Sequence, residues 1–178
     1  MAQMSDRFRL DGRIAFVSGA SGHLGREMSR ALCEAGAHVI LHGRDDARLS
    51  DFEAQLLGEG FSVERIAFDL ADLAGLRAYF ASLERLDVLV NNAISMTPRP
   101  FGALEPEDFG STYASAVTAA FEAARAGLPA LCRAVAETGD ASIVNVASMY
   151  GVVAPDARIY AEPAQASPFH YGPAKAAL

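Results

Sequence analysis

Apolar positions along this chain follow two different periods. Short continuous apolar runs, closed by glycine or polar residues, indicate buried strands, whereas apolar residues repeated every three or four positions indicate helices with one buried face. The runs predict strands at residues 14–17, 38–41, 61–68, 86–90 and 142–147. The helical pattern occupies residues 23–35, 47–57, 73–83 and 106–138 between them, and a last helix opens at Tyr171.

The same pattern predicts how the helices begin, bend and face the core. Asp72 is a typical N-cap residue for helix 73–83, and Gly127 and Pro129 are expected to break or bend helix 106–138. The expected inward faces are Leu24, Met28, Ala31, Leu32 and Ala35 in helix 23–35, and Leu49, Phe52, Leu56 and Leu57 in helix 47–57.

Strands that alternate with helices of this length predict an α/β fold, a doubly wound parallel sheet with helices on both faces. The chain has 178 residues, 51% of them apolar, and we expect one domain spanning residues 1–178. The carboxyl ends of parallel strands share one edge of the sheet, and ligands bind beyond that edge. The residues expected along it are Ser18 and Gly19, Gly43 and Arg44, Asp69 and Leu70, Asn91, Asn92 and Ala93, and Ser148.

Charge and cysteine content narrow the class of protein. A net charge of −7 without a local Lys/Arg cluster argues against a nucleic-acid surface. The first residues lack the apolar core of a secretion signal, and no run reaches the roughly 18 apolar residues of a membrane span, so we expect a soluble cytoplasmic protein. Cys33 and Cys132 lie in helical patterns without metal-ligand spacing, so free thiols are expected rather than a disulfide.

The stretch that follows the first predicted strand has the pattern of an anion site. Gly19, Gly22 and Gly25 separate the strand from helix 23–35. Glycines let the backbone approach a phosphate closely, and a helix N-terminus offers unpaired N–H groups and partial positive charge. The pattern favours a dinucleotide site, and a plain tight turn is the alternative reading.

Tyr171 and Lys175 form the second candidate for chemistry. They are four residues apart, so on a helix they share one face. An ammonium group near a phenol favours the phenolate, which suits proton transfer to or from an alcohol. Ser148 could donate a hydrogen bond to the same substrate oxygen. Taken alone, such a tyrosine–lysine pair is more often a solvated helix face, and such a serine is most often a cap or turn residue.

Together, these segments resemble the short-chain dehydrogenase/reductase family. The resemblance runs in the family's order from about residue 10 to the end of the chain. The residues that carry it are Ser18-Gly19-Ala20-Ser21-Gly22-His23-Leu24-Gly25, Asp69-Leu70, Asp87 with Asn91-Asn92-Ala93, Ile143-Val144-Asn145-Val146-Ala147-Ser148 and Tyr171-Gly172-Pro173-Ala174-Lys175.

The resemblance implies a Rossmann fold and reversible hydride transfer between a nicotinamide ring and a small carbonyl or alcohol substrate. Tyr171 would be the acid/base, Ser148 would orient the substrate oxygen, and Lys175 would assist the tyrosine and hold the nicotinamide ribose. The residues implied in cofactor binding are Ser18, Gly19, Ser21, Gly22, His23, Leu24 and Gly25 at the turn, then Asp69, Leu70, Asn91, Asn92, Ala93, Tyr171 and Lys175.

Four features depart from the family pattern. His23 stands where the common form has its middle glycine, and Ala116, next to Ser115, stands where an asparagine usually serves a proton relay. Residues 155–169 form an insert before Tyr171, read either as a lid or substrate wall or as a tolerated surface loop. The family's chain continues beyond the Tyr171 helix with two more strands, which are missing from these 178 residues.

Cofactor choice depends on the residue after the second strand. An acidic side chain there would bind the ribose of NAD(H), but the position holds Gly43, followed by Arg44. A guanidinium suits a 2′-phosphate, so NADP(H) is favoured over NAD(H), with a surface ion pair of Arg44 as the alternative.

The resemblance therefore favours an NADP(H)-dependent oxidoreductase, expected to form a homo-oligomer without nucleic-acid or membrane partners. The rival hypothesis is a non-catalytic nucleotide-binding or structural protein, or an inactive fragment. Strand 142–147 would be an open sheet edge in these 178 residues, and such an edge tends to pair with another chain.

Overall fold

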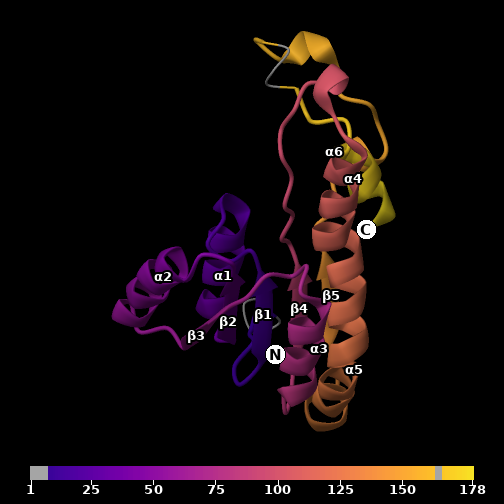
Figure 1. The fold of residues 1–178 in the computed structure, drawn as a ribbon. Coiled ribbons are helices and arrows are strands. Elements are labelled where there is room, and N and C mark those ends of the chain that lie inside the picture. The colour runs from indigo at the N-terminus through magenta and orange to yellow at the C-terminus, as the bar shows by residue number, and fades with distance from the viewer. Residues whose placement is uncertain (1–7, 163–165) are drawn as a thin grey trace.

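The five strands form one parallel sheet in the order β3-β2-β1-β4-β5 (Figure 1). The computed structural model of the chain describes residues 8–162 and 166–178. The strands are β1 (Ile14–Ser18), β2 (His38–Gly43), β3 (Val63–Ala67), β4 (Val88–Asn91) and β5 (Ser142–Asn145). The order runs outward from β1 in both directions, so β1 and β4 flank the point where the winding reverses. This confirms the predicted α/β class and its Rossmann arrangement.

Helices cover both faces of the sheet, as the alternation of elements predicts (Figure 1). On one face lie α1 (His23–Glu34) and α2 (Asp46–Gly58). On the other lie α3 (Leu73–Ser82) and α5 (Ala119–Thr138). The chain then extends past the carboxyl ends of the strands with α4 (Pro106–Tyr113), α6 (Tyr171–Ala177) and the 3-10 helices η2 (Phe101–Ala103), η4 (Met149–Gly151) and η5 (Ala157–Ile159).

Alternation along the strands divides the core into two layers. Val17 of β1 packs with Val39 and Leu41 of β2 beneath α1 and α2. Phe16, the neighbouring residue, points to the opposite face and packs with Ile40 and Leu89 against α3 and α5. Successive strand side chains face opposite sides, so each strand residue is committed to one layer.

Three side chains predicted to face the core are instead exposed. Leu24 at the start of α1 is 56% exposed and Leu57 near the end of α2 is 51% exposed. The buried residues of α1 are Gly25, Ser29 and Cys33, and Ala31 also faces solvent. A Cβ built on Gly25 would lie 2.1 Å from the Gly19 carbonyl oxygen, so this contact rotates α1 about its axis and turns Leu24 outward.

The long helical region differs from its prediction in where it becomes irregular. α5 runs through Gly127 and Pro129 without a break, and Gly127 packs closely against Phe80. A π-helical segment, Ala114–Thr118, instead joins α4 to α5. Such single π turns occur frequently at functional sites, and this one lies next to the cavity described below.

β5 forms an edge of the sheet. It pairs with β4 alone in the described chain, from Val88 opposite Ser142 to Asn91 opposite Asn145. All its residues are exposed, with Ile143 at 47% and Val144 at 46%. The strand also ends at Asn145, two residues before the predicted end, because the backbone then turns toward η4.

Candidate active site

A cavity of about 430 Å³ lies beyond the carboxyl ends of β1, β2 and β4. It brings together most of the residues that the sequence placed at this edge: Gly19, Ser21, Gly22, His23, Leu24, Gly25, Arg44, Asp69, Leu70, Asn92, Ala93, Tyr171 and Lys175. Three predicted site residues, Ser18, Asn91 and Ser148, do not line it. One cavity thus joins the glycine turn to the tyrosine–lysine pair, more than 140 residues away in sequence.

The glycine turn has the backbone geometry of an anion site. Gly19 has a φ of +68°, a conformation that side chains other than glycine rarely adopt, and the Gly22 N–H donates to its carbonyl at 3.0 Å. No side chain caps α1 at Gly22. The first N–H groups of α1 are therefore available to a phosphate placed in the cavity.

Ser18 and Asn91 support the cavity from beneath. The buried Ser18 Oγ accepts hydrogen bonds from the N–H groups of Asn92 and Ala93, at 2.9 and 3.0 Å. Asn91 Nδ2 donates to Asn145 Oδ1 at 2.9 Å and so joins the ends of β4 and β5. These two residues fix the positions of the lining residues that follow β1 and β4.

Tyr171 and Lys175 lie on α6, as the sequence predicted, and both line the cavity. The Lys175 ammonium is buried and donates a hydrogen bond to the Val146 carbonyl. Burial lowers the pKa of this lysine from its ordinary value. The ammonium is thereby held at the cavity wall, next to the end of β5.

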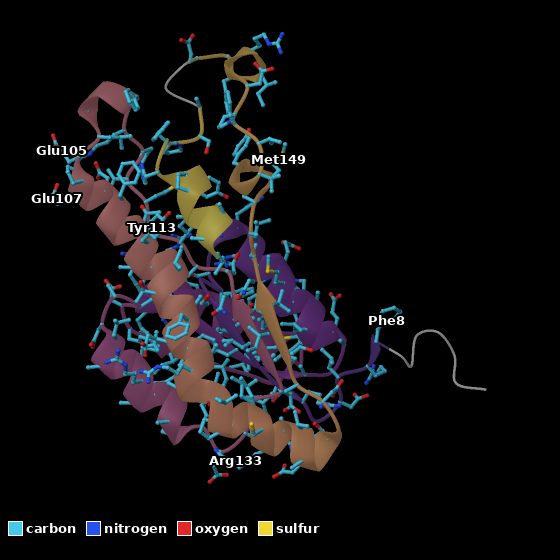
Figure 2. All side chains as sticks on the ribbon, turned by 90° about the vertical axis from the view of Figure 1, so that its right-hand side faces the viewer. Phe8, Glu105, Glu107, Tyr113, Arg133 and Met149 are labelled. Carbon is cyan, nitrogen blue, oxygen red and sulfur yellow. The ribbon has the colours of Figure 1, made fainter. Side chains whose placement is uncertain are left out.

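Ser148 sits between β5 and η4, outside the cavity lining. Its Oγ accepts a hydrogen bond from the Tyr150 N–H at 3.2 Å and caps η4. Figure 2 shows η4, marked by Met149, beside the yellow α6. The two elements pack closely, because a Cβ on Gly172 would lie 2.6 Å from the Tyr150 carbonyl oxygen. Ser148 is thereby held near the first turn of α6.

Arginines surround the other end of the cavity. Arg44 and Arg48 both line it, together with Ser21 and Asp45. Arg48 Nη2 donates to the Ser21 carbonyl at 3.3 Å, and Arg26 Nε donates to the same oxygen at 3.4 Å. The Asp45 side chain accepts the Arg48 backbone N–H at 3.1 Å and caps α2. This end of the cavity is suited to an anion.

His42, the last residue but one of β2, also lines the cavity. Its ring is buried, and its Nε2 lies 3.1 Å from the Phe68 carbonyl oxygen. Burial lowers the pKa of His42 to about 4, although the Phe68 carbonyl and Asp69 favour the charged form. The imidazole is therefore neutral at pH 7 and contributes an uncharged surface to the cavity.

Ser115 lines the cavity from the π-helical segment. Its Oγ accepts the Ser95 N–H at 2.9 Å, which pins the chain after β4 against that segment. Ala116 is buried and does not line the cavity. The hydroxyl next to the expected asparagine position thus reaches the site.

Sequence reasoning did not assign several lining residues to the site: His42, Asp45, Arg48, Ile94, Ser95, Ser115, Val146 and Ala147. For two of these residues, Asp45 and Arg48, the sequence does contain a signal that indicates the site. Asp45 and Arg48 begin the helix after β2, and the first turn of such a helix faces the carboxyl edge of the sheet. For Ser115 the local sequence gives no sign of a π turn.

Comparison with known proteins decides the family. The family model for short chain dehydrogenases matches residues 13–161, which is most of the chain. The chain belongs to the short-chain dehydrogenase family. The match includes every strand of the sheet and the glycine turn, and it ends before α6.

Individual relatives agree with this assignment. The chain is 32% identical to the rhamnolipids biosynthesis 3-oxoacyl-[acyl-carrier-protein] reductase of Pseudomonas aeruginosa, over 98% of this chain and 66% of the relative. It is 29% identical to the gluconate 5-dehydrogenase of Gluconobacter oxydans, over 84% of this chain and 58% of that relative. The chain thus spans two thirds or less of the length of these relatives.

Solved structures share the fold closely. The Pseudomonas aeruginosa RhlG/NADP active-site complex superposes with a TM-score of 0.82 at 31% identity, covering 96% of this chain and 64% of that one. The gluconate 5-dehydrogenase of Burkholderia cenocepacia, in complex with NADP and tartrate, gives a TM-score of 0.78 at 28% identity, covering 98% and 65%. Both family members bind NADP.

Within the described chain, no helix combines the length and apolar character that crossing a membrane requires. Among residues 8–162 and 166–178, no group of three or more His, Cys, Asp or Glu side chains could hold a metal ion.

Proposed function

We propose that this protein is an NADP(H)-dependent oxidoreductase that interconverts a small carbonyl compound and its alcohol. The observation that carries the proposal is the single cavity that joins the glycine turn to Tyr171 and Lys175. The uncapped N-terminus of α1 and the close approach of Gly25 to Gly19 suit a pyrophosphate, and the arginine end suits the adenosine. A bound nicotinamide supplies or accepts the hydride in this chemistry.

In the direction of reduction, the Tyr171 hydroxyl gives its proton to the substrate oxygen as the carbonyl carbon receives hydride. Lys175, held on the Val146 carbonyl, stabilises the phenolate that remains and binds the ribose. The Ser148 Oγ accepts the Tyr150 N–H, so its own O–H remains free to donate to the substrate oxygen. In oxidation the same proton returns to Tyr171.

Cofactor preference and assembly form part of the same proposal. Arg44 has no carboxylate partner among the described residues and lines the cavity just after β2, which favours a 2′-phosphate and hence NADP(H). We also propose that the protein is cytoplasmic and that its exposed β5 edge takes part in a homo-oligomer.

Replacing Tyr171 tests the proposal directly. Tyr171→Phe removes the proton donor and keeps the ring, so turnover of a carbonyl panel with NADPH should fall about 10²- to 10⁴-fold while NADPH affinity stays nearly constant. Tyr79→Phe, which removes a hydroxyl on α3 outside the cavity, is the matched control. Unchanged turnover in Tyr171→Phe would refute the mechanism, and NADPH binding without any turnover in the unmodified protein would favour the non-catalytic rival.

A further inference from the structure

The arginines of this protein divide into two groups by their partners. Most of those described form ion pairs with carboxylates: Arg9, Arg13, Arg30, Arg65, Arg77, Arg85, Arg99, Arg125 and Arg158. Arg133 donates to the carbonyls of Leu83 and Glu84. The remaining described arginines, Arg26, Arg44 and Arg48, have no carboxylate partner among residues 8–162 and 166–178. Arg26 and Arg48 both donate to the Ser21 carbonyl, and Arg44 lines the same cavity as Ser21. In a chain of net charge −7, this grouping indicates a site for an external anion.

The three arginines are held in different ways. Arg26 lies 4.5 Å from the centre of the Phe52 ring, donates to the Ser21 carbonyl and does not line the cavity. Arg48 lines the cavity and is fixed at two points, by its guanidinium on the Ser21 carbonyl and by its backbone N–H on Asp45. Arg44 lines the cavity without a hydrogen-bond partner among the described residues.

Two acidic residues, Asp45 and Asp69, line the cavity, and Asp45 lies between Arg44 and Arg48 in the sequence. The Asp45 side chain accepts the N–H of Arg48 and caps α2, so part of its charge is used at the helix N-terminus. A guanidinium has five N–H donors, and the bond to Ser21 occupies one of those on Arg48. The others remain available to an anion between Arg48 and Arg44.

We propose that Arg48 is a second phosphate-binding residue, which acts with Arg44 as a two-armed clamp on the 2′-phosphate of the cofactor. This inference rests on the proposed NADP(H) preference and adds the residue that completes its specificity. A phosphate dianion is satisfied better by two guanidinium groups than by one. Because Arg48 is already anchored in the free protein, its ordering on binding costs less than that of Arg44.

The test uses nucleotide binding by the complete protein and needs no turnover. Adenosine 2′,5′-bisphosphate and 5′-AMP differ only in the 2′-phosphate, and calorimetry gives the affinity ratio between them. Arg48→Met keeps the aliphatic stem and should weaken the bisphosphate about 10- to 100-fold, while 5′-AMP changes less than about threefold. Arg44→Met should have a similar effect, and Arg48→Lys should restore part of the affinity.

Arg26→Met is the matched control, because it removes the neighbouring guanidinium that does not line the cavity. It should keep the unmodified affinity ratio, and thermal melting of each variant establishes that it is folded. If Arg48→Met keeps the unmodified ratio while Arg44→Met loses it, the inference about Arg48 is wrong and the NADP(H) preference stands. If the unmodified protein binds both nucleotides equally, the preference itself fails, and the clamp fails with it.

Discussion

His42 shows how a single residue can link the cavity to the stability of the fold. Its ring lies between Phe16 and Phe68, with ring centres 5.4 and 4.3 Å away. Nδ1 has no hydrogen-bond partner in the described chain. The ring is only 1% exposed, so a proton placed on it would create a charge in an apolar layer.

The lowered pKa of His42 predicts how stability depends on pH. Burial reduces this pKa from 6.5 to about 4, so an unfolded chain binds the proton more readily than the folded one. The stabilisation is complete above about pH 6.5 and is lost as the pH falls toward 4, by about 3 kcal/mol at most. Urea titrations at several pH values should therefore show the advantage of the unmodified protein over His42→Gln shrinking across this range.

His38→Gln serves as the control for that series, since His38 is partly exposed at the start of β2. The same replacement at His38 shows what a His→Gln change in β2 does to stability outside the cavity lining. A constant difference between the unmodified protein and His42→Gln from pH 7 to pH 4 would contradict the argument.

Residue-level prediction from sequence succeeded where the signal was local. Tyr171 and Lys175 are four apart on a predicted helix, and the glycines are closely spaced, so their geometry follows from local backbone rules. Arg48 and Ser115 reach the cavity through contacts with Ser21 and Ser95, 27 and 20 residues away in sequence. Such contacts depend on how elements pack, and hydrophobic periodicity carries no information about them. The catalytic roles of Ser148, Tyr171 and Lys175 stay predictions.

At the scale of elements, the approach of α1 to β1 decides how the glycine turn is presented. Gly25 lies so close to Gly19 that a methyl group has no room. Gly25→Ala should push α1 away from the turn, destabilise the protein by about 1–3 kcal/mol and weaken NADPH binding. Gly58→Ala, at the end of α2 with open space around it, should be neutral or slightly stabilising. Thermal melts and calorimetry of the two variants check this, and equal behaviour would argue against the close contact.

The same contact explains why one element-level prediction, the inward position of Leu24, failed. Periodicity predicted the strands and helices to within a few residues, because each period reports the burial of a whole face. Periodicity placed Leu24 inward because Leu24 is apolar. In the structure Gly25 faces inward instead, because only a residue without a side chain fits against Gly19. The π-helical segment was not predicted, because a helical turn with one extra residue has no distinctive amino-acid composition.

At the scale of the whole 178-residue chain, the exposed β5 edge predicts association between copies. Ile143 and Val144 are about half exposed on a strand with one free side in the described chain. Val144→Lys should disfavour pairing at this edge, so light scattering should show a lower mass than for the unmodified chain. Val152→Lys, an exposed change in the loop after η4, should leave the mass as it was. Equal masses for all three proteins would exclude β5 as the contact.

The cavity also connects parts of the chain that touch little elsewhere. The arginine end belongs to residues 19–48, whereas Tyr171 and Lys175 belong to α6, which meets the rest of the fold mainly through η4, the π-helical segment, α4 and Val146. A dinucleotide that reaches both ends of the cavity would contact both parts of the chain and hold them together. Local opening of α6 would then become rarer as the dinucleotide concentration rises, so the rigidity of α6 would depend on how much dinucleotide is present.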